Sequence, residues 1–205
     1  RDLFPEAETS EPLIKTAVDV PSEKIQLTGR AGLFENLDNL DASPVSSLYP
    51  QTMEDLGQSY GYVLYRTQIE RDTSEPERIR VVDGRDRAQV YVYGSLVATQ
   101  YQEHIGEDIR HALPEKDNQL DVLVENMGRV NYGHKFLADT QHKGIRTGVC
   151  VDLHFVLGWE QHRLSLEDIS DIDYAAGWAE GTPSFSRFEF SLDEPADTYV
   201  DTTGF

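Results

Sequence analysis

The chain has 205 residues with an ordinary hydrophobic content of 39%, and 37 acidic against 18 basic side chains give it a formal net charge of -19 at pH 7. This excess of negative charge argues against nucleic acid and anionic membrane surfaces as partners and leaves neutral ligands open. No apolar run approaches the roughly 18 residues that a membrane helix needs, so the sequence predicts no membrane-spanning segment.

Both ends of the chain read as cut edges. Residues 1–12 (RDLFPEAETSEP) lack an initiating Met, a leader pattern and any periodicity, which is typical of a linker. Residues 197–205 (DTYVDTTGF) stop just after an expected strand. We therefore expect a fragment of a longer protein.

Cysteine and glycan signals bear on the compartment. Cys150 is the only cysteine, so it forms no internal disulfide, and its apolar setting (VCVDLHF) favours a buried, inert thiol over a nucleophile. The sequence also has no Asn-x-Ser/Thr glycosylation acceptor. Both features favour a reducing compartment, the bacterial cytoplasm, with secretion as the alternative.

The predicted elements are mostly short strands. Two strands at 13–20 and 24–28 follow the linker, and a loose connection covers 31–50. Thr52 with an acidic residue three positions later predicts a one-turn helix at 52–58. The remaining segments show the alternation or the apolar character of strands, and they lie at 60–69, 78–82, 87–93, 96–101, 119–126, 149–166, 185–192 and 197–205.

Two dipeptides predict tight hairpins between these strands. Asp83-Gly84 separates the segments 78–82 and 87–93, and Gly94-Ser95 follows the second of them. Because no predicted helix exceeds two turns and strand follows strand, the sequence predicts an all-β fold, an antiparallel β-sandwich of the jelly-roll type.

Motifs for independent catalysis or metal binding are weak. Two carboxylates can cleave a sugar bond together, but in so acidic a chain the local pairs Glu54–Asp55 and Glu167–Asp168 fit helix-start or loop acids better. The histidines lack metal-ligand spacing, and the acids of DISDID (168–173) match a calcium loop only in part. No nucleophile elbow or phosphate loop occurs. We predict neither a metal nor a cofactor.

Aromatic side chains are better candidates for function, because ring faces stack on sugars while amides and carboxylates bind the sugar hydroxyls. Tyr132, Trp159 and Trp178 qualify by type, with packing in the core as the alternative. Directional polar groups gather around the first of them, in the segment LVENMGRVNYG. The candidate site residues there are Glu125, Asn126, Arg129, Asn131 and Tyr132.

Several motifs occur in the order that one known family shows. They are QSYGYVLYRT (58–67), DRAQVYVYG (86–94), LDVLVENMGRVNYG (120–133), KGI (143–145) and DTYVDTTGF (197–205). Together they resemble the region downstream of the catalytic barrel in glycoside hydrolase family 35 β-galactosidases. VENMGRVNYG is the long and specific match among them.

The resemblance implies a domain organisation. Residues 1–46 are a linker with leading strands, and residues 47–166 form a first, galactose-binding-domain-like jelly-roll sandwich. Residues 167–205 then supply a connection and the first strands of a second, truncated sandwich.

The resemblance also implies what the longer protein does. Family members hydrolyse terminal β-galactosides with retention, using glutamates on a TIM barrel, and nothing in this chain matches that barrel. We therefore expect a fragment that is inactive alone, supports the missing catalytic barrel and borders its pocket, with β-galactosides as substrates of the parent. The alternatives are an autonomous galactose- or carbohydrate-binding module and an architectural domain that forms homodimers.

In the family, the VENMGRVNYG loop faces the barrel, and its Tyr lies close to the galactose pocket. By resemblance, Tyr132 takes that position, and Arg129 and Asn131 hold the loop. The alternative is that all five polar candidates satisfy the backbone of a buried loop. An interface role predicts exposed or unpaired side chains in the isolated chain, whereas the alternative predicts buried and paired ones.

Overall fold

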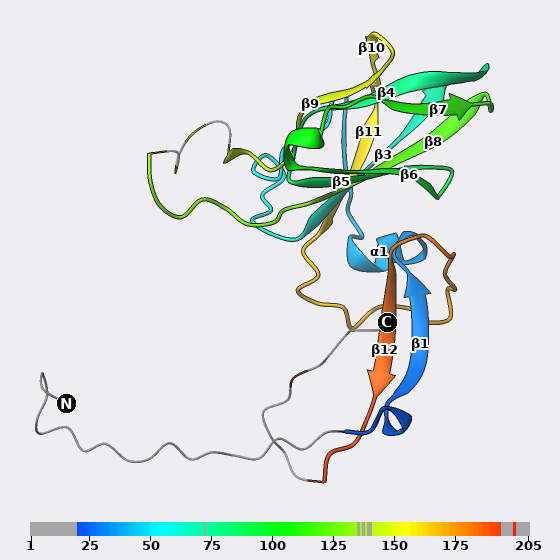
Figure 1. The fold of residues 1–205 in the computed structure, drawn as a ribbon, viewed down its shortest axis with the longest axis vertical. Helices are drawn as coiled ribbons and strands as arrows, with labels where there is room; N and C mark the ends of the chain where they lie inside the picture. Colours follow the sequence, from blue (N-terminus) through cyan, green and yellow to red (C-terminus); the bar gives the residue numbers. More distant parts are fainter. Residues whose placement is uncertain are drawn as a thin grey trace, which may run out of the picture. The chain divides into compact units, whose positions relative to one another are not determined.

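The computed structural model describes residues 20–71, 73–134, 136, 138, 141–193 and 199. Within them the structure is built almost entirely from strands and turns, and the one α-helix, α1 (Leu37–Leu40), is a single turn (Figure 1). Residues 29–186 form one compact unit. The predicted all-β fold is confirmed. No helix among the described residues is long and apolar enough to span a membrane.

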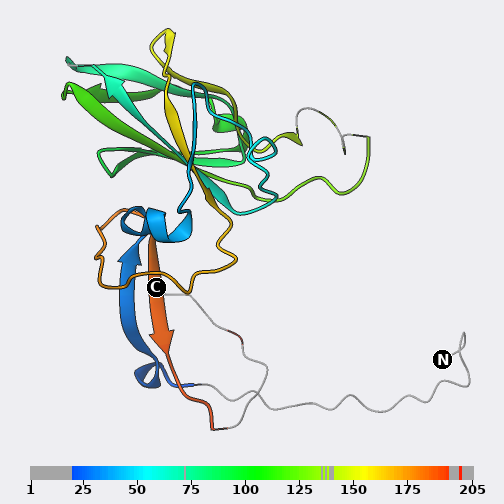
Figure 2. The same cartoon turned by 180° about the vertical axis from the view of Figure 1, so that it is seen from behind.

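Two antiparallel sheets make the sandwich. The six-stranded sheet has the order β2-β11-β3-β8-β5-β6, with β2 (Val45–Ser47), β3 (Tyr62–Glu70), β5 (Arg87–Val92), β6 (Ser95–Tyr101), β8 (Asp117–Glu125) and β11 (Trp159–Leu164). The four-stranded sheet has the order β10-β9-β4-β7, with β4 (Thr73–Arg85), β7 (Ile109–Leu113), β9 (Gly144–Val151) and β10 (His154–Phe155). Figure 1 and Figure 2 show the two sheets on opposite sides of the core.

Strand β3 is central, as its apolar side chains on both faces predict. It pairs with β8 from Tyr62↔Glu125 to Glu70↔Asp117 and with β11 on its other edge. One face contributes Val63 and Tyr65 to the core between the sheets. The opposite face contributes Leu64 to a second cluster, in which Leu33 and Leu37 from the segment of η2 (Phe34–Asn36) and α1 cover the sheet. The central part of the six-stranded sheet is therefore covered by apolar side chains on both faces.

The core between the sheets is closely packed by β-branched and aromatic side chains. Val81 of β4, Val90 of β5 and Trp159 of β11 are almost completely buried there. Each such side chain contributes about 1.5–3 kcal/mol through burial. Trp159 also donates its indole N–H to the Val156 carbonyl at 2.8 Å, which satisfies its only polar group. The alternative of core packing is thus confirmed for Trp159.

The hairpin predicted at Asp83-Gly84 is wrong. Strand β4 continues through both residues, with Gly84 opposite Ile145 and Arg85 opposite Gly144, and then the chain crosses to the other sheet to begin β5. A register shift between Val82 and Gly84 marks a bulge, and Asp83 has a φ of 58° there. The dipeptide therefore supplies the left-handed residue of a bulge, not the turn of a hairpin.

The second predicted hairpin is confirmed, one residue earlier than expected. Strands β5 and β6 pair directly, and the turn between them is Tyr93-Gly94, with φ angles of 49° and 71°. Two successive positive φ angles are the signature of a type I′ turn. Strand β6 is the last strand of its sheet, because among the described residues it pairs with β5 alone.

Several boundaries differ from the prediction. The segment 149–166 is divided among β9, β10 and β11, because Asp152 and Gly158 turn the chain with positive φ angles. The strand predicted at 24–28 is β1 (Gln26–Gly32), and the one at 185–192 is β12 (Ser184–Glu189); these two pair with each other. The short 3-10 turns are η1 (Ser22–Lys24) and η3 (Gln102–His104).

Two predicted strands cannot be compared with the structure. The strand at 13–20 lies outside the described residues except for Val20, and the segment 197–205 does so except for Tyr199. The domain boundaries at 46/47 and 166/167 stay predictions.

Candidate functional site

The candidate residues lie at the end of β8 and at the start of the segment 126–143, which connects β8 of one sheet to β9 of the other. We call this segment the connecting loop. Figure 1 shows its described parts extending beyond the ends of both strands. Connections this long are uncommon in compact domains and are usually functional.

Asn126 fixes the point where the connecting loop leaves β8. Its backbone N–H donates to the Gly61 carbonyl at 3.0 Å, and its side-chain amide donates to the Ser59 carbonyl at 2.9 Å. The side-chain oxygen accepts the Gly128 N–H at 3.0 Å, which is the pattern of an Asx turn. Every polar group of this side chain thus has a partner, so Asn126 serves local structure.

Glu54 is presented by a short capped turn. Thr52 and Asp55 bond reciprocally, because the Thr52 hydroxyl donates to the Asp55 carboxylate at 2.7 Å and accepts the Asp55 N–H at 3.2 Å. The Leu56 N–H donates to the Thr52 carbonyl at 3.0 Å, so the predicted one-turn helix is a single hydrogen-bonded turn. Asp55 is therefore the capping acid, and Glu54 is free to point elsewhere.

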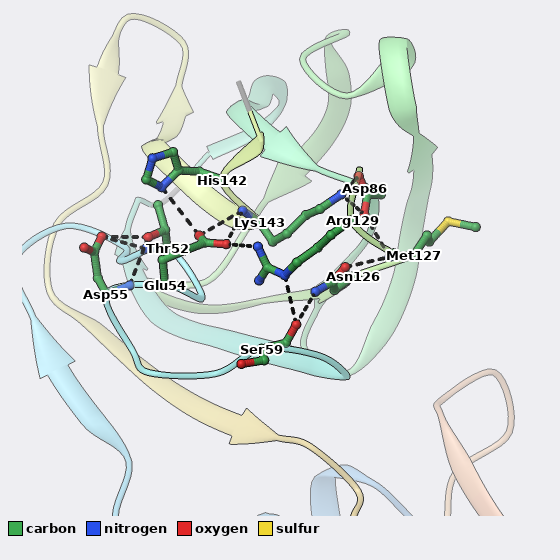
Figure 3. A network of polar contacts seen from close by, with 11 residues as sticks. Thr52, Glu54, Asp55, Ser59, Asp86, Asn126, Met127, Arg129, His142 and Lys143 are labelled. Carbon is green, nitrogen blue, oxygen red and sulfur yellow. Dashed lines mark hydrogen bonds and ion pairs between the residues drawn. The ribbon is translucent and has the colours of Figure 1, made fainter. Parts of the chain in front are cut away.

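The carboxylate of Glu54 joins the two ends of the connecting loop (Figure 3). At one end it pairs with the Arg129 guanidinium, and at the other it accepts the Lys143 backbone N–H at 3.0 Å. His142 Nδ1 lies 3.5 Å away. Burial raises the pKa of Glu54, but the hydrogen bonds from Arg129 and Lys143 outweigh that effect and hold it below the usual value.

The carboxylate of Asp86 joins the same two ends. It accepts the Met127 N–H at 2.8 Å and both of its oxygens lie 2.7 Å from the Lys143 ammonium (Figure 3). Lys143 is only 5% exposed. Asp86 is itself fixed where β4 gives way to β5, because its N–H donates to the Glu125 carbonyl and its carbonyl accepts the Gln102 N–H, each at 2.8 Å.

Two further candidates are engaged within the chain. Arg129 donates to the Ser59 carbonyl at 3.1 Å in addition to its pairing with Glu54. Glu125, the last residue of β8, accepts one hydrogen bond from Arg87 Nε at 2.6 Å and one from the Tyr62 hydroxyl at 3.3 Å, and it also forms an ion pair with the Arg87 guanidinium. Burial and the Glu125 charge raise the pKa of Tyr62.

The remaining two candidates lie at the tip and face solvent. Tyr132 is 90% exposed, Asn131 is exposed as well, and neither has a hydrogen bond to another described residue. The five candidates therefore divide. Glu125, Asn126 and Arg129 are paired at the base, as the structural alternative predicts, whereas Asn131 and Tyr132 are displayed, as an interface role predicts.

Asp86 and Lys143 each begin one of the quoted family motifs but were not predicted as site residues, and Glu54 was predicted to be a helix-start or loop acid. Glu54 and Arg129 are 75 positions apart, and so remote a partnership leaves no spacing signal in a single sequence. Trp178 packs its ring against the Arg30 guanidinium at 4.5 Å, which occupies a face that a sugar would use.

The arrangement suits positioning better than bond cleavage. The pKa of Glu54 is lowered, whereas a general acid needs a raised one, and the Asp86 carboxylate is paired with the Lys143 ammonium. Among the described residues, no three His, Cys, Asp or Glu side chains gather as metal ligands. Cys150 is partly buried, and burial raises the pKa of its thiol. The fold and the site thus define an all-β sandwich domain in which Glu54 and Asp86 bind the two ends of one projecting loop.

The chain belongs to the family of the first all-beta domain of beta-galactosidases, whose model matches residues 50–165. It is 35% identical over 175 residues to a beta-galactosidase from Xanthomonas manihotis, a match that covers 85% of this chain and 28% of that protein. It is 31% identical over 209 residues to the Homo sapiens beta-galactosidase, covering 90% of this chain and 29% of that protein. The chain thus spans less than a third of the length of these relatives.

Proposed function

We propose that the chain is a non-catalytic β-sandwich region of a β-galactosidase that hydrolyses terminal β-galactosides with retention. Its role is to support the catalytic barrel and to border the sugar pocket with the connecting loop. The family membership and the resemblance of VENMGRVNYG support the parent activity. The geometry of the connecting loop supports the role within that parent.

One observation carries the proposal, namely the contrast between the base and the tip of the connecting loop. The base is fixed by polar contacts of carboxylates, amides and cations, yet large apolar side chains along the loop, from Met127 onward, face solvent. These are Met127, Val130, Tyr132 and Phe136, with exposed fractions of 48%, 38%, 90% and 53%. A braced loop that presents apolar groups is typical of a surface that another domain covers.

The carboxylates of the site do not supply a retaining mechanism. Such a mechanism needs one carboxylic acid with a raised pKa and a second carboxylate as nucleophile, about 5–5.5 Å apart. The pKa of Glu54 is lowered, because the bonds from Arg129 and Lys143 outweigh the effect of burial. Both carboxylate oxygens of Asp86 accept hydrogen bonds from the Lys143 ammonium. The proposal therefore assigns bond cleavage to another domain and positioning to this one.

The test is a kinetic comparison in the full-length β-galactosidase with a chromogenic β-galactoside. Tyr132→Ala is expected to raise KM about tenfold, which corresponds to about 1.4 kcal/mol of lost binding, and to leave the thermal midpoint unchanged. Tyr101→Ala is the matched control, since Tyr101 is a tyrosine exposed on β6. The chain alone is expected to give no turnover.

Turnover by the purified chain itself, above that of a mock preparation, would refute the non-catalytic role. A wild-type KM for Tyr132→Ala would refute the assignment of the loop tip to the sugar pocket.

Autonomous binding of a sugar is the second candidate function. The observation that favours it is a pocket of about 440 Å³ beside the Asp86–Lys143 pair, lined by carboxylates, amides and cations that can bind sugar hydroxyls. These include Asp83, Arg85, Asp86, Gln102, Gln141 and Lys143. Titration calorimetry of the chain with galactose and lactose tests this binding. A saturable one-site signal would support the second candidate function, and the absence of such a signal would refute it. Homodimerisation and a bacterial cytoplasmic location stay predictions.

A further inference from the structure

Two carboxylates from separate parts of the chain each contact both ends of the connecting loop. Glu54 receives Arg129 from the first end and the Lys143 N–H from the second. Asp86 receives the Met127 N–H from the first end and the Lys143 ammonium from the second. Neither carboxylate belongs to the loop. The loop is thus closed by two bridges, which we call the double clasp (Figure 3).

Both bridging residues are themselves held by independent contacts. Glu54 lies between Thr52 and Asp55, which bond reciprocally in the capped turn. Asp86 is fixed through its backbone N–H and carbonyl at the crossing between the two sheets. Because the supports are rigid, the positions of the loop ends are dictated by the sandwich and not by the loop.

We propose that Glu54 and Asp86 are positioning residues, which hold the ends of the connecting loop so that its tip presents Tyr132 to the sugar. This inference rests on the proposed function. Tyr132 has no hydrogen bond to another described residue that would hold it in place. The position of Tyr132 therefore depends on the positions of the loop ends, so a shift of either end at the bridges also shifts Tyr132.

The chemistry of the double clasp requires charge and not only shape. A carboxylate accepts bonds from a guanidinium, an ammonium and backbone N–H groups at once, whereas the isosteric amide replaces one acceptor with a donor. In Glu54→Gln, the new amide N–H group faces another donor, either the Arg129 guanidinium or the Lys143 N–H. In Asp86→Asn, it faces either the Lys143 ammonium or the Met127 N–H. Either change opens one bridge while leaving the volume of the side chain nearly unchanged.

The first arm of the test measures hydrogen exchange in this chain. Asp86→Asn is expected to speed exchange of the Met127 amide at least about tenfold, and Glu54→Gln to do so for the Lys143 amide. The Leu64 amide, in the central strand, reports global unfolding. Asp108→Asn is the matched control, because Asp108 pairs with Arg80 at 2.6 Å and with Arg78 at 3.7 Å, and both partners lie on β4, outside the connecting loop. Wild-type exchange at both loop amides would overturn the double clasp.

The second arm measures a double-mutant cycle in the full-length β-galactosidase. Glu54→Gln is expected to raise KM severalfold while kcat changes less, and to have no further effect on KM when Tyr132 is already Ala. Additive effects on KM, or a wild-type KM for Glu54→Gln, would overturn the positioning role. Glu54→Gln is suited to this arm because Glu54 is partly exposed, so the substitution is expected to lower the stability of the fold without abolishing it.

The two arms separate the inference from the proposed function. If Tyr132→Ala changes KM but Glu54→Gln does not, the positioning role is refuted and the proposed function stands. If Tyr132→Ala leaves KM unchanged, the proposed function and the positioning of Tyr132 are both refuted, and hydrogen exchange alone then decides whether the bridges close the loop.

Discussion

At the scale of single residues, Lys143 is the point on which the polar contacts of the loop base converge. Its backbone N–H goes to Glu54, its carbonyl accepts the Met53 N–H at 2.9 Å, and its ammonium faces both oxygens of Asp86. An ammonium this deeply buried is stable only beside an opposite charge, because removal from water penalises the charged form. Lys143 and Asp86 therefore depend on each other.

Replacing Lys143 with Met tests that dependence. Met keeps most of the apolar stem but leaves the Asp86 carboxylate without its cation, so we expect a loss of about 3 kcal/mol in the free energy of unfolding. Urea denaturation of the chain measures it. Lys116→Met is the control, because Lys116 is exposed and is expected to change the free energy by less than about 0.5 kcal/mol. Equal effects of the two substitutions would contradict the argument.

The residues of the site were predictable only where the signal was local. Polar character marked Asn126 and Arg129 as candidates, and the Thr52–Asp55 spacing indicated a capped turn. Nothing in a single sequence shows that Glu54 meets Arg129 or that Asp86 meets Lys143, because those pairs form only when two sheets close around a core. Ion pairs between residues far apart in the sequence can therefore be identified only once the fold is known.

At the scale of elements, the first residue of β9 packs directly beneath β3. Gly144 has a φ of 82°, and a Cβ there would collide with the Tyr65 hydroxyl. That hydroxyl is already used, since it donates to the Gln51 carbonyl at 2.7 Å and accepts the Ile145 N–H at 3.1 Å. The end of the connecting loop and the beginning of β9 thus need a residue without a side chain.

Gly144→Ala is expected to be more costly than an equivalent change in an open turn. Gly94 has a similar φ of 71°, and no atom lies within 4 Å of a Cβ built on it. Gly94→Ala should lose about 1 kcal/mol from backbone strain alone, and Gly144→Ala about 2 kcal/mol more from the collision. Denaturant unfolding of both variants provides the comparison. Similar losses would show that the Tyr65 contact is unimportant.

Strand existence was predictable at this scale, but strand pairing was not always so. Apolar side chains on both faces identified β3, β5 and β8, because the central part of their sheet is covered on both sides. The Asp83-Gly84 dipeptide misled, since the same left-handed preference serves a hairpin turn or a bulge. Which of the two forms depends on the strand that pairs with β4. Here that strand is β9, whereas a hairpin would have paired β4 with β5.

At the scale of the whole molecule, the acidic composition makes stability depend on pH. Burial raises the pKa of Asp41, but hydrogen bonds from Arg163 and Ser43 outweigh this and hold it below its usual 3.8. Glu54 is likewise held below its usual 4.5, where Arg129 and Lys143 outweigh burial. A lowered pKa in the folded state means stability that is present above the usual value and lost as the pH falls through the folded value.

We therefore expect the thermal midpoint to fall between about pH 5 and pH 3, as these carboxylates take up protons. Reduced repulsion near the isoelectric point of about 4.5 acts in the opposite direction, so the comparison with a variant is decisive. Asp41→Asn should be less stable than wild type at pH 6 and lose less on acidification. Parallel pH profiles for the two proteins would contradict the assignment to Asp41.

The position of β6 at the rim of its sheet has a consequence for how the chain behaves at high concentration. Its sequence, SLVATQY, contains no charge and no proline, so it lacks two of the usual devices that prevent an edge strand from pairing with a neighbouring molecule and keeps a bulge at Val97. The net charge of -19 supplies the opposing repulsion instead. Salt shortens the range of that repulsion to about 3 Å at 1 M, so ionic strength sets whether the molecules stay separate or associate edge to edge.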